Sequence, residues 1–200
     1  MLDAPTLRAA IRSWCTQMKV VAPELNSLDA QIGDGDLGAT LEKCASNIAD
    51  ALPGMENAGV AELFECCSAA CAKASGSTFG TLLSIAFLTA ARNCAGHQEI
   101  APRYVGQMLL EVSAALSRRG GASLGDKTIV DVVHAVGAAI VKAPEHVDLM
   151  RVARDSTRHT LMSFRDKPSK TGRARMFAPK SIGVDDPGMV AFQRMLESVC

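Results

Sequence analysis

The segment Ala101–Leu116, APRYVGQMLLEVSAAL, shows the pattern that decides the fold. Its larger apolar residues recur at intervals of three and four positions, which places them on one face of an α-helix. They are Val105, Met108, Leu109, Val112 and Leu116. The segment Lys127–Lys142 repeats the pattern with Ile129, Val132, Val133, Val136 and Ile140. The same periodicity covers most of the chain without an alternating strand pattern, so we expect an all-α fold.

Eight helices are expected from this periodicity and from the breaks at glycine and proline. They are about Pro5–Val21, Gly38–Leu52, Val60–Ala74, Ser77–Cys94, a helix from Ala101, Lys127–Lys142, Glu145–Arg165 and a helix from Pro187. The links are short except for a loop over Asp166–Asp186. Helices joined by short links predict an antiparallel bundle or barrel, which we assign to one domain over residues 1–200.

The composition excludes several classes of function. Apolar residues make up 48% of the 200 residues, enough for a core without disulfides, and 21 basic residues balance 21 acidic ones. A neutral chain with 4% aromatic residues lacks the charge and the stacking surfaces of a nucleic-acid-binding protein. An odd number of cysteines, seven, predicts buried thiols, and neither a signal sequence nor a membrane-spanning run is found. We expect a soluble, cytoplasmic protein without a membrane partner.

Four links are rich in glycine and polar residues. They span Asp29–Thr40, Ala74–Thr81, Gly120–Thr128 and Gly172–Gly188, and they join the first helix to the second, the third to the fourth, the fifth to the sixth and the seventh to the eighth. In an antiparallel arrangement, alternate links emerge at the same end of the bundle. The sequence therefore predicts one functional site, built from four loops at one rim of a rigid scaffold.

The first of these links carries the densest acidic motif, LDAQIGDGDLG over Leu28–Gly38. Asp29, Asp34 and Asp36 can converge because the intervening glycines let the chain bend. Three converging carboxylates repel one another unless cations neutralise them, and Mg²⁺ prefers such hard oxygen ligands. Two ions suit three bridging carboxylates better than one. The alternative is a plain acidic turn; a calcium EF-hand fails, because Gly38 and Ala45 stand where it needs acceptor side chains.

The other three links offer features that bind phosphate. ASGSTFGT, over Ala74–Thr81, lies at a helix N-terminus, where free N–H groups attract anions, although Ser and Thr also cap helices without a ligand. GGASLGDKT, over Gly120–Thr128, differs from a Walker A motif because Asp126 precedes Lys127 and a helix precedes the loop. We expect Asp126 to cap the next helix and Lys127 to be solvated. Arginines of the fourth link suit phosphate oxygens.

Taken together, these strings resemble the nucleotide-binding L subunit, or C-terminal domain, of dihydroxyacetone kinases. The resemblance runs along nearly the whole chain and rests on LDAQIGDGD, ASGSTFGT, GDKTIVD and GRARMFAPKSIGVDDPG, in the family's order. It implies an eight-helix barrel that binds ADP or ATP with two Mg²⁺ ions at one rim. It also implies a phosphotransferase that acts on dihydroxyacetone or a related short ketose.

The resemblance assigns roles residue by residue. The metal ligands would be Asp29, Asp34 and Asp36. The nucleotide contacts would be Leu37, Gly38, Ala39, Thr40, Ala74, Ser75, Gly120, Ile129, Arg173, Asp186, Pro187 and Gly188. No catalytic residue beyond this metal–nucleotide site is expected on the chain.

Two positions depart from the family pattern. Leu37 stands where relatives that use a phosphoenolpyruvate-driven phosphocarrier have histidine and where ATP-using relatives have a small or polar residue. Leucine cannot hydrogen-bond a nucleotide, so that contact is lost or replaced. Ala72-Lys73 replaces a double glycine before the second link. These departures keep open a non-catalytic binding or regulatory module with the same barrel.

The resemblance also implies partners. In the family, a histidine on another subunit or domain holds the triose covalently, and nothing similar to that α/β half is found in this chain. We therefore expect a separate sugar-holding subunit and a homodimeric L-type subunit. The phosphoryl donor is either exchangeable ATP or bound ADP that a phosphotransferase-system phosphocarrier recharges.

Overall fold

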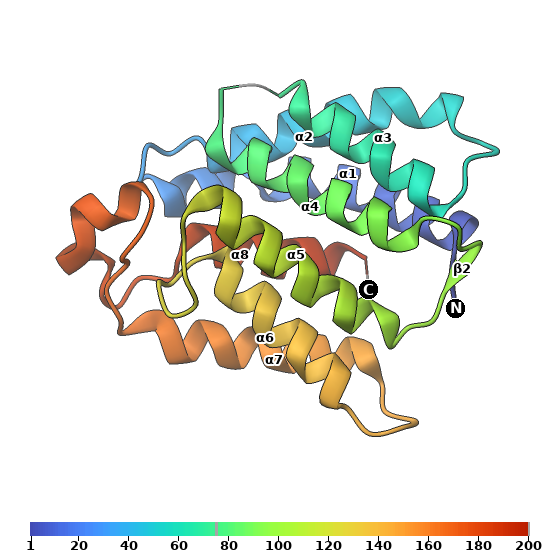
Figure 1. The fold of residues 1–200 in the computed structure, drawn as a ribbon. Coiled ribbons are helices and arrows are strands. Elements are labelled where there is room, and N and C mark those ends of the chain that lie inside the picture. Colours follow the sequence, from blue (N-terminus) through green and yellow to red (C-terminus); the bar gives the residue numbers. More distant parts are fainter. Residues whose placement is uncertain (75, 200) are drawn as a thin grey trace.

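A computed structural model describes residues 1–74 and 76–199. Within them it contains eight α-helices, drawn in Figure 1: α1 (Ala4–Asp29), α2 (Leu37–Ala51), α3 (Val60–Ala72), α4 (Thr78–Cys94), α5 (Tyr104–Gly120), α6 (Ile129–Lys142), α7 (Leu149–Arg165) and α8 (Pro187–Ser198). Two 3₁₀ segments, Leu52–Gly54 and Arg173–Ser181, lie in the links. The all-α prediction is confirmed, and most helix limits differ from the expected ones by one to four residues.

The first helix is the main exception, because α1 continues through Pro23 to Asp29 instead of ending near Val21. Proline removes one backbone hydrogen bond and usually breaks a helix. Here Pro23 is exposed, whereas Ala22 and Leu25 are buried against the rest of the protein. Packing of this apolar face compensates for the lost bond, so Asp29 is the last residue of a rigid helix rather than part of a loop.

The helices form a closed ring. Each helix packs against the next one along the chain, and α8 returns to pack against α1 (Figure 1). Arg194 of α8 strengthens this closure, because its guanidinium donates to both carboxylate oxygens of Glu24 on α1, at 3.0 and 2.6 Å. The expected antiparallel barrel is therefore present.

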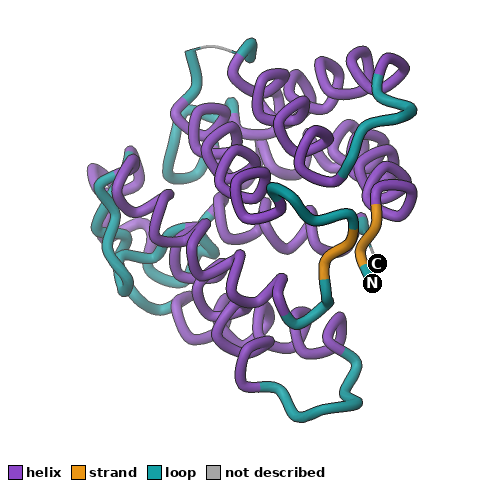
Figure 2. Tube along the Cα trace, turned by 45° about the vertical axis from the view of Figure 1, so that its right-hand side comes forward, coloured by secondary structure: helices purple, strands orange, loops and turns teal. Residues whose placement is uncertain are grey.

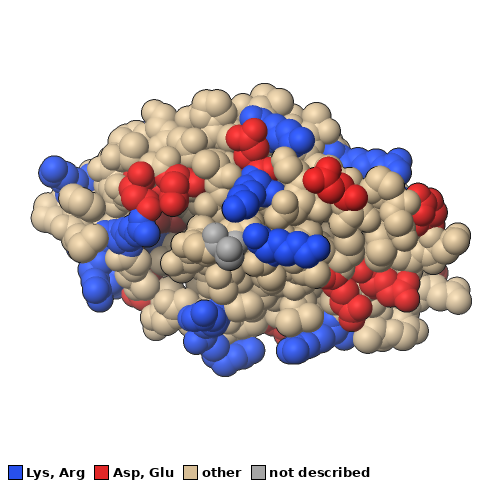
Figure 3. Space-filling model, turned by 90° about the horizontal axis from the view of Figure 1, so that it is seen from above, with Lys and Arg blue, Asp and Glu red and all other residues tan. Residues whose placement is uncertain are grey.

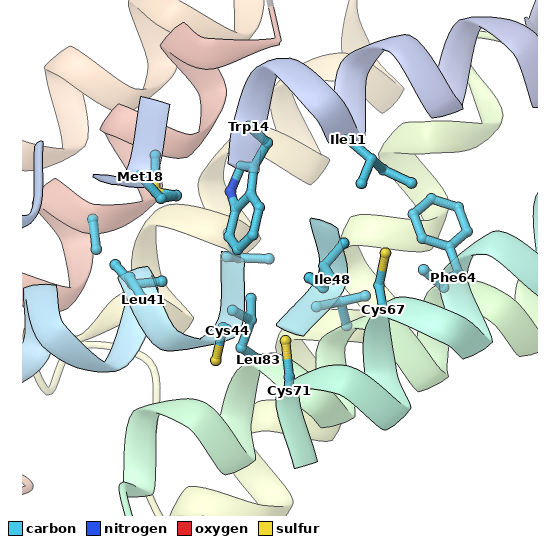
Figure 4. Close-up of a cluster of buried hydrophobic side chains, with 14 of the residues drawn as sticks. Ile11, Trp14, Met18, Leu41, Cys44, Ile48, Phe64, Cys67, Cys71 and Leu83 are labelled. Carbon is cyan, nitrogen blue, oxygen red and sulfur yellow. The ribbon is translucent and has the colours of Figure 1, made fainter. Parts of the chain in front are cut away.

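Apolar side chains fill the interior of the ring (Figure 4). Trp14 of α1 packs edge-on against Phe87 of α4, with 6.2 Å between the ring centroids. The cysteines Cys44, Cys67 and Cys71 lie in the same cluster as free thiols, as predicted, and burial raises the pKa of Cys67. Among the helices of the described residues, none is long and apolar enough to cross a membrane.

Two short strands at the end opposite the four polar links were not expected. β1 (Leu2–Asp3) pairs antiparallel with β2 (Glu99–Ile100), beside the N-terminus in Figure 2. Strands of two residues are too short to show an alternating pattern in the sequence. They fix the start of α1, where Asp3 accepts a hydrogen bond from the Thr6 N–H at 2.9 Å as the N-cap.

Candidate functional site

The four polar links lie at one end of the barrel, on the left of Figure 1. Direct contacts join three of them. The Thr171 hydroxyl donates to Asp126 Oδ2 at 2.8 Å, which joins the third link to the fourth. Arg173 forms an ion pair with Asp34, which joins the fourth link to the first. The prediction that these links meet at one rim is confirmed.

The three aspartates of the first link converge. One carboxylate oxygen from each of Asp29, Asp34 and Asp36 lies within 4.8 Å of the other two. The loop folds around Asp29, whose Oδ2 accepts backbone N–H groups from Gly35, Asp36 and Leu37 at 2.9, 3.1 and 3.4 Å. Since Asp29 ends α1, a rigid element holds the first carboxylate and the backbone of the loop positions the other two.

Gly33 leaves room for the second oxygen of Asp29. A Cβ atom at this position would lie 2.3 Å from Asp29 Oδ1, so any other residue would displace the carboxylate. The result is a set of hard oxygen donors close to one another, which is the chemistry that Mg²⁺ takes from proteins. The residues present fit the expected divalent cation.

Arg173 brings positive charge to this acidic cluster. Its guanidinium contacts Asp34, and both side chains are well exposed. Figure 3 shows acidic and basic side chains side by side at this end of the molecule. The planar guanidinium presents several donors, so an arginine at this position can bind an anion as well as a carboxylate.

The start of α2, where the resemblance places phosphate contacts, is mostly buried. Leu37, Gly38 and Thr40 are buried, and the Leu37 side chain is 6% exposed within the apolar core. Leucine at this position therefore serves packing, and only its backbone N–H reaches the loop. Ala39 is exposed, and its N–H donates to Asn26 Oδ1 at 3.0 Å. Asn26 was not among the site residues expected from the sequence, because the expected first helix ended before it.

The second link reaches the rim through the first turn of α4. Gly76 adopts a left-handed φ of 103°, and the side chain of the N-cap residue Ser77 makes no capping hydrogen bond. Within the part of the chain that the structure describes, the first N–H groups of α4 therefore receive no side-chain cap from Ser77, a condition that suits an anion. Ala74 is buried, and Ser75 lies outside the described residues.

Both expectations for the third link were wrong. Thr128, not Asp126, caps α6, and Asp131 completes the capping box. Asp126 instead accepts the Ser123 N–H at 2.8 Å and the Thr171 hydroxyl, and these two bonds lower the pKa of its carboxyl. Lys127 is not solvated, because its side chain is turned inward and only 1% of it is exposed. The sequence shows only an acidic residue before a helix and a lysine in a polar loop. It does not show how either side chain is oriented.

The expected nucleotide contacts of the last two links lie close together. Ile129 begins α6 and Gly188 lies in the first turn of α8, where a Cβ would be 3.6 Å from Ile129 Cβ and 3.4 Å from Phe79 of α4. Phe79 was not singled out, although it lies within the ASGSTFGT string. Gly120 ends α5, close to Leu82 of α4. These residues form an apolar wall beside the rim.

Asp186 is the residue directly before α8. It accepts the Met189 N–H at 2.9 Å as the N-cap, and Pro187 follows it in the favoured first position. Loss of surrounding water raises the pKa of Asp186 to about 7. The group is therefore partly protonated near neutral pH and is a weak candidate for a metal ligand.

Comparison with known proteins shows the family of the chain. Residues 31–200 match the family model of the DAK2 domain. The chain is 30% identical over 184 residues to L-erythrulose 1-kinase of Mycolicibacterium smegmatis, covering 88% of this chain and 32% of that protein. It is 24% identical over 198 residues to the ADP-binding subunit DhaL of the PEP-dependent dihydroxyacetone kinase of Escherichia coli, covering 95% and 94%.

The fold matches solved structures as well. The native dihydroxyacetone kinase of C. freundii superposes with a TM-score of 0.76 at 23% identity, over 99% of this chain and 34% of that one. The same enzyme in complex with AMP-PNP and Mg²⁺ gives a TM-score of 0.72 at 23% identity, over 96% of this chain and 32% of that one. The chain thus spans about a third of the larger kinases and nearly the full length of the ADP-binding subunit.

Proposed function

Because the chain belongs to the DAK2 domain family, we propose that it is the nucleotide-binding phosphotransfer subunit of a dihydroxyacetone-kinase-type enzyme. One observation carries the proposal. The three carboxylates of the first link converge at the same rim as the uncapped start of α4 and the arginine of the fourth link. Sites that transfer phosphoryl groups need this combination of metal ligands and phosphate-binding groups.

In this proposal, Asp29, Asp34 and Asp36 hold Mg²⁺, with two ions as the expected number. The bound cations would neutralise the negative charge of the nucleotide phosphates. The protein contributes the geometry. Asp29 is fixed by three backbone N–H groups, and the glycine at position 33 leaves room for its second oxygen.

The nucleotide would lie across the rim. The phosphates would meet the N–H groups at the start of α4, next to Ala74 and Ser75, and the guanidinium of Arg173. The base would pack against the wall of Ile129, Gly188 and Phe79, near Gly120 and Pro187. Leu37, Gly38 and Thr40 would support this arrangement from the core rather than by side-chain contact, because they are buried.

The acceptor would be dihydroxyacetone or another short ketose such as erythrulose, held on a separate subunit. The relatives named above include an erythrulose kinase three times as long as this chain and an ADP-binding subunit of about its own length. The donor would be ATP, or ADP recharged by a phosphocarrier, and the subunit would be a homodimer in the cytoplasm.

Thermal unfolding tests the metal–nucleotide site directly. We expect Mg-ADP and Mg-ATP to raise Tm, whereas either nucleotide without Mg²⁺ should not. A ligand at about 100 times its Kd adds about 2.7 kcal/mol of stability, which corresponds to a rise of several degrees at roughly 2–4 °C per kcal/mol. Asp34→Asn should abolish the rise.

Asp50→Asn is the matched control, because Asp50 is an exposed carboxylate in the last turn of α2, at the opposite end of that helix from the rim. It should keep the full rise in Tm. An Asp34→Asn variant that binds Mg-ADP normally would refute the metal assignment. If neither nucleotide shifts the wild type, the non-catalytic module becomes the better interpretation. Phosphate transfer to dihydroxyacetone after addition of a sugar-holding subunit would exclude that module.

A further inference from the structure

Lys127 has an environment that the proposed nucleotide site does not explain. Among the described residues it is the largest fully buried side chain, with 1% of its surface exposed. Its backbone adopts a left-handed φ of 63°, uncommon for a residue other than glycine. A buried lysine in a strained backbone position persists only if specific contacts hold it there.

The contacts are three hydrogen bonds to backbone carbonyls. Nζ of Lys127 donates to the carbonyl of Arg165 at 2.9 Å, of Lys167 at 2.8 Å and of Ser181 at 2.7 Å. An ammonium group has three donor hydrogens, so its capacity is fully used. Two of the carbonyls belong to the chain leaving α7, and the third belongs to the end of the 3₁₀ segment Arg173–Ser181.

Lys127 therefore joins the two ends of the 166–186 loop. Neighbouring bonds complete the junction. Gly183 N–H donates to the carbonyl of Arg165 at 2.9 Å, and Arg165 Nε donates to the carbonyl of Gly183 at 3.0 Å. Asp126 adds a bond from the Lys170 N–H at 3.1 Å and the Thr171 bond described above. Residues of the third link thus hold together the two ends of the 166–186 loop.

The loop closed in this way carries Arg173, which contacts Asp34 of the acidic cluster. We propose that Lys127 is a positioning residue that fixes the 166–186 loop, and with it Arg173, over the metal–nucleotide site. For the role of Arg173 at the nucleotide site, the inference rests on the proposed function. For the role of Lys127, it concerns only the structure of the loop.

A direct contact between Lys127 and a phosphate is the competing interpretation, since GDKT resembles a Walker A ending. It conflicts with the geometry, because the three donors of Nζ are all bonded to carbonyls and the side chain is not accessible. A phosphate contact would require the base of the loop to open. Methionine at position 127 would keep the volume but leave three carbonyls, at least partly buried, without this donor, which is costly.

Limited proteolysis with trypsin, without nucleotide, tests the loop. In Lys127→Met, cleavage after Arg173 and Arg175 should be at least tenfold faster than in the wild type. Lys170→Met is the matched control, because it removes one positive charge from the same loop at an exposed side chain. It should be cleaved at the wild-type rate. Equal rates for Lys127→Met and wild type would overturn the inference.

Amine labelling of the wild type keeps the inference testable if Lys127→Met does not fold. An acetylating reagent should modify Lys170 at least tenfold faster than Lys127, as read by mass spectrometry. Equal labelling of the two lysines would overturn the inference.

A mutant cycle then tests the link to the site. Lys127→Met should weaken Mg-ADP binding at least tenfold in the wild-type background and less than twofold in an Arg173→Ala background, because the arginine to be positioned is gone. An equal loss in both backgrounds would overturn the positioning role. If wild type binds no Mg-ADP, the proposed function fails, while the proteolysis result still decides the role of Lys127 in the loop.

Discussion

Asp186 shows how the fold changes the chemistry of a single residue. Its ordinary pKa is 3.8, and burial raises it to about 7, although the nearby Lys127 and two backbone N–H groups act in the opposite direction. Between these two pH values the folded protein keeps a proton that the unfolded chain releases. Stability from this group is therefore present at low pH, falls as the pH rises towards about 7, and is constant above it.

Asp186→Asn should remove this pH dependence. Asparagine caps a helix as well as aspartate does, so it can still accept the Met189 N–H, but it does not titrate. Between pH 5 and pH 8, the wild type should lose about 1–3 kcal/mol of unfolding free energy relative to the variant. Urea denaturation at the two pH values measures the difference. Parallel pH profiles for the two proteins would show that Asp186 titrates normally.

Lys127 makes the complementary point about single residues. In the sequence it lies in a glycine-rich loop beside an aspartate, where lysines are usually solvated. The three carbonyls that bury it come from residues 38 to 54 positions further along the chain. No local sequence pattern indicates partners that far along the chain. The motif by itself therefore could not show that Lys127 is buried.

At the scale of elements, the junction of α1 and α2 positions the metal ligands. Gly38 lies directly against α1, and a Cβ there would be 1.9 Å from the carbonyl oxygen of Ala22. Besides its expected role as a phosphate contact, position 38 therefore has to be glycine for α2 to pack against α1. The sequence did not show this requirement. Close approach of the two helices brings Asp36, at the start of α2, to Asp29, at the end of α1.

Gly38→Ala should destabilise the protein by about 1–3 kcal/mol, because the new methyl group overlaps backbone atoms of α1 and the helices must separate. Gly54→Ala is the control, since nothing lies within 4 Å of a Cβ at that position. It should change the stability by less than about 0.5 kcal/mol. Chemical denaturation of both variants gives the comparison, and equal stabilities would mean that the α1–α2 contact is looser than described.

The length of α1 is a further property that tertiary packing decided. Local rules end a helix near proline, which is why Val21 was the expected limit. Burial of the Ala22 and Leu25 side chains stabilises the continued helix instead. The extension matters for function, because it places Asn26 and Asp29 on a rigid element at the rim.

At the scale of the whole molecule, closure of the ring makes the helices depend on one another. Each consecutive pair packs together, and the bond between Arg194 and Glu24 joins residues 170 positions apart. Their ion pair lowers the pKa of Glu24. Loss of any one helix would open the ring and expose the shared core, which supports the assignment of residues 1–200 to one domain.

Calorimetry should therefore show one unfolding transition, with equal calorimetric and van't Hoff enthalpies. The scan is made with EDTA and without nucleotide, so that no bound ligand stabilises part of the molecule. Two separate transitions, or a calorimetric enthalpy well above the van't Hoff value, would divide the chain into independently folding parts.

The sequence by itself determined the helical class, the order of the helices and the four polar links at one rim. Apolar periodicity and glycine-rich breaks are local signals, and the alternating direction of helices in a bundle places the four links at the same end. The sequence also identified the three aspartates, which lie within eight residues of one another.

Tertiary structure alone decided which way the side chains of the links face. Leu37 packs in the core and Lys127 turns inward, while Asn26 and Phe79 join the rim. The physical reason is the same in each case. Burial depends on partners from distant parts of the chain, and their positions exist only once the ring of helices has closed.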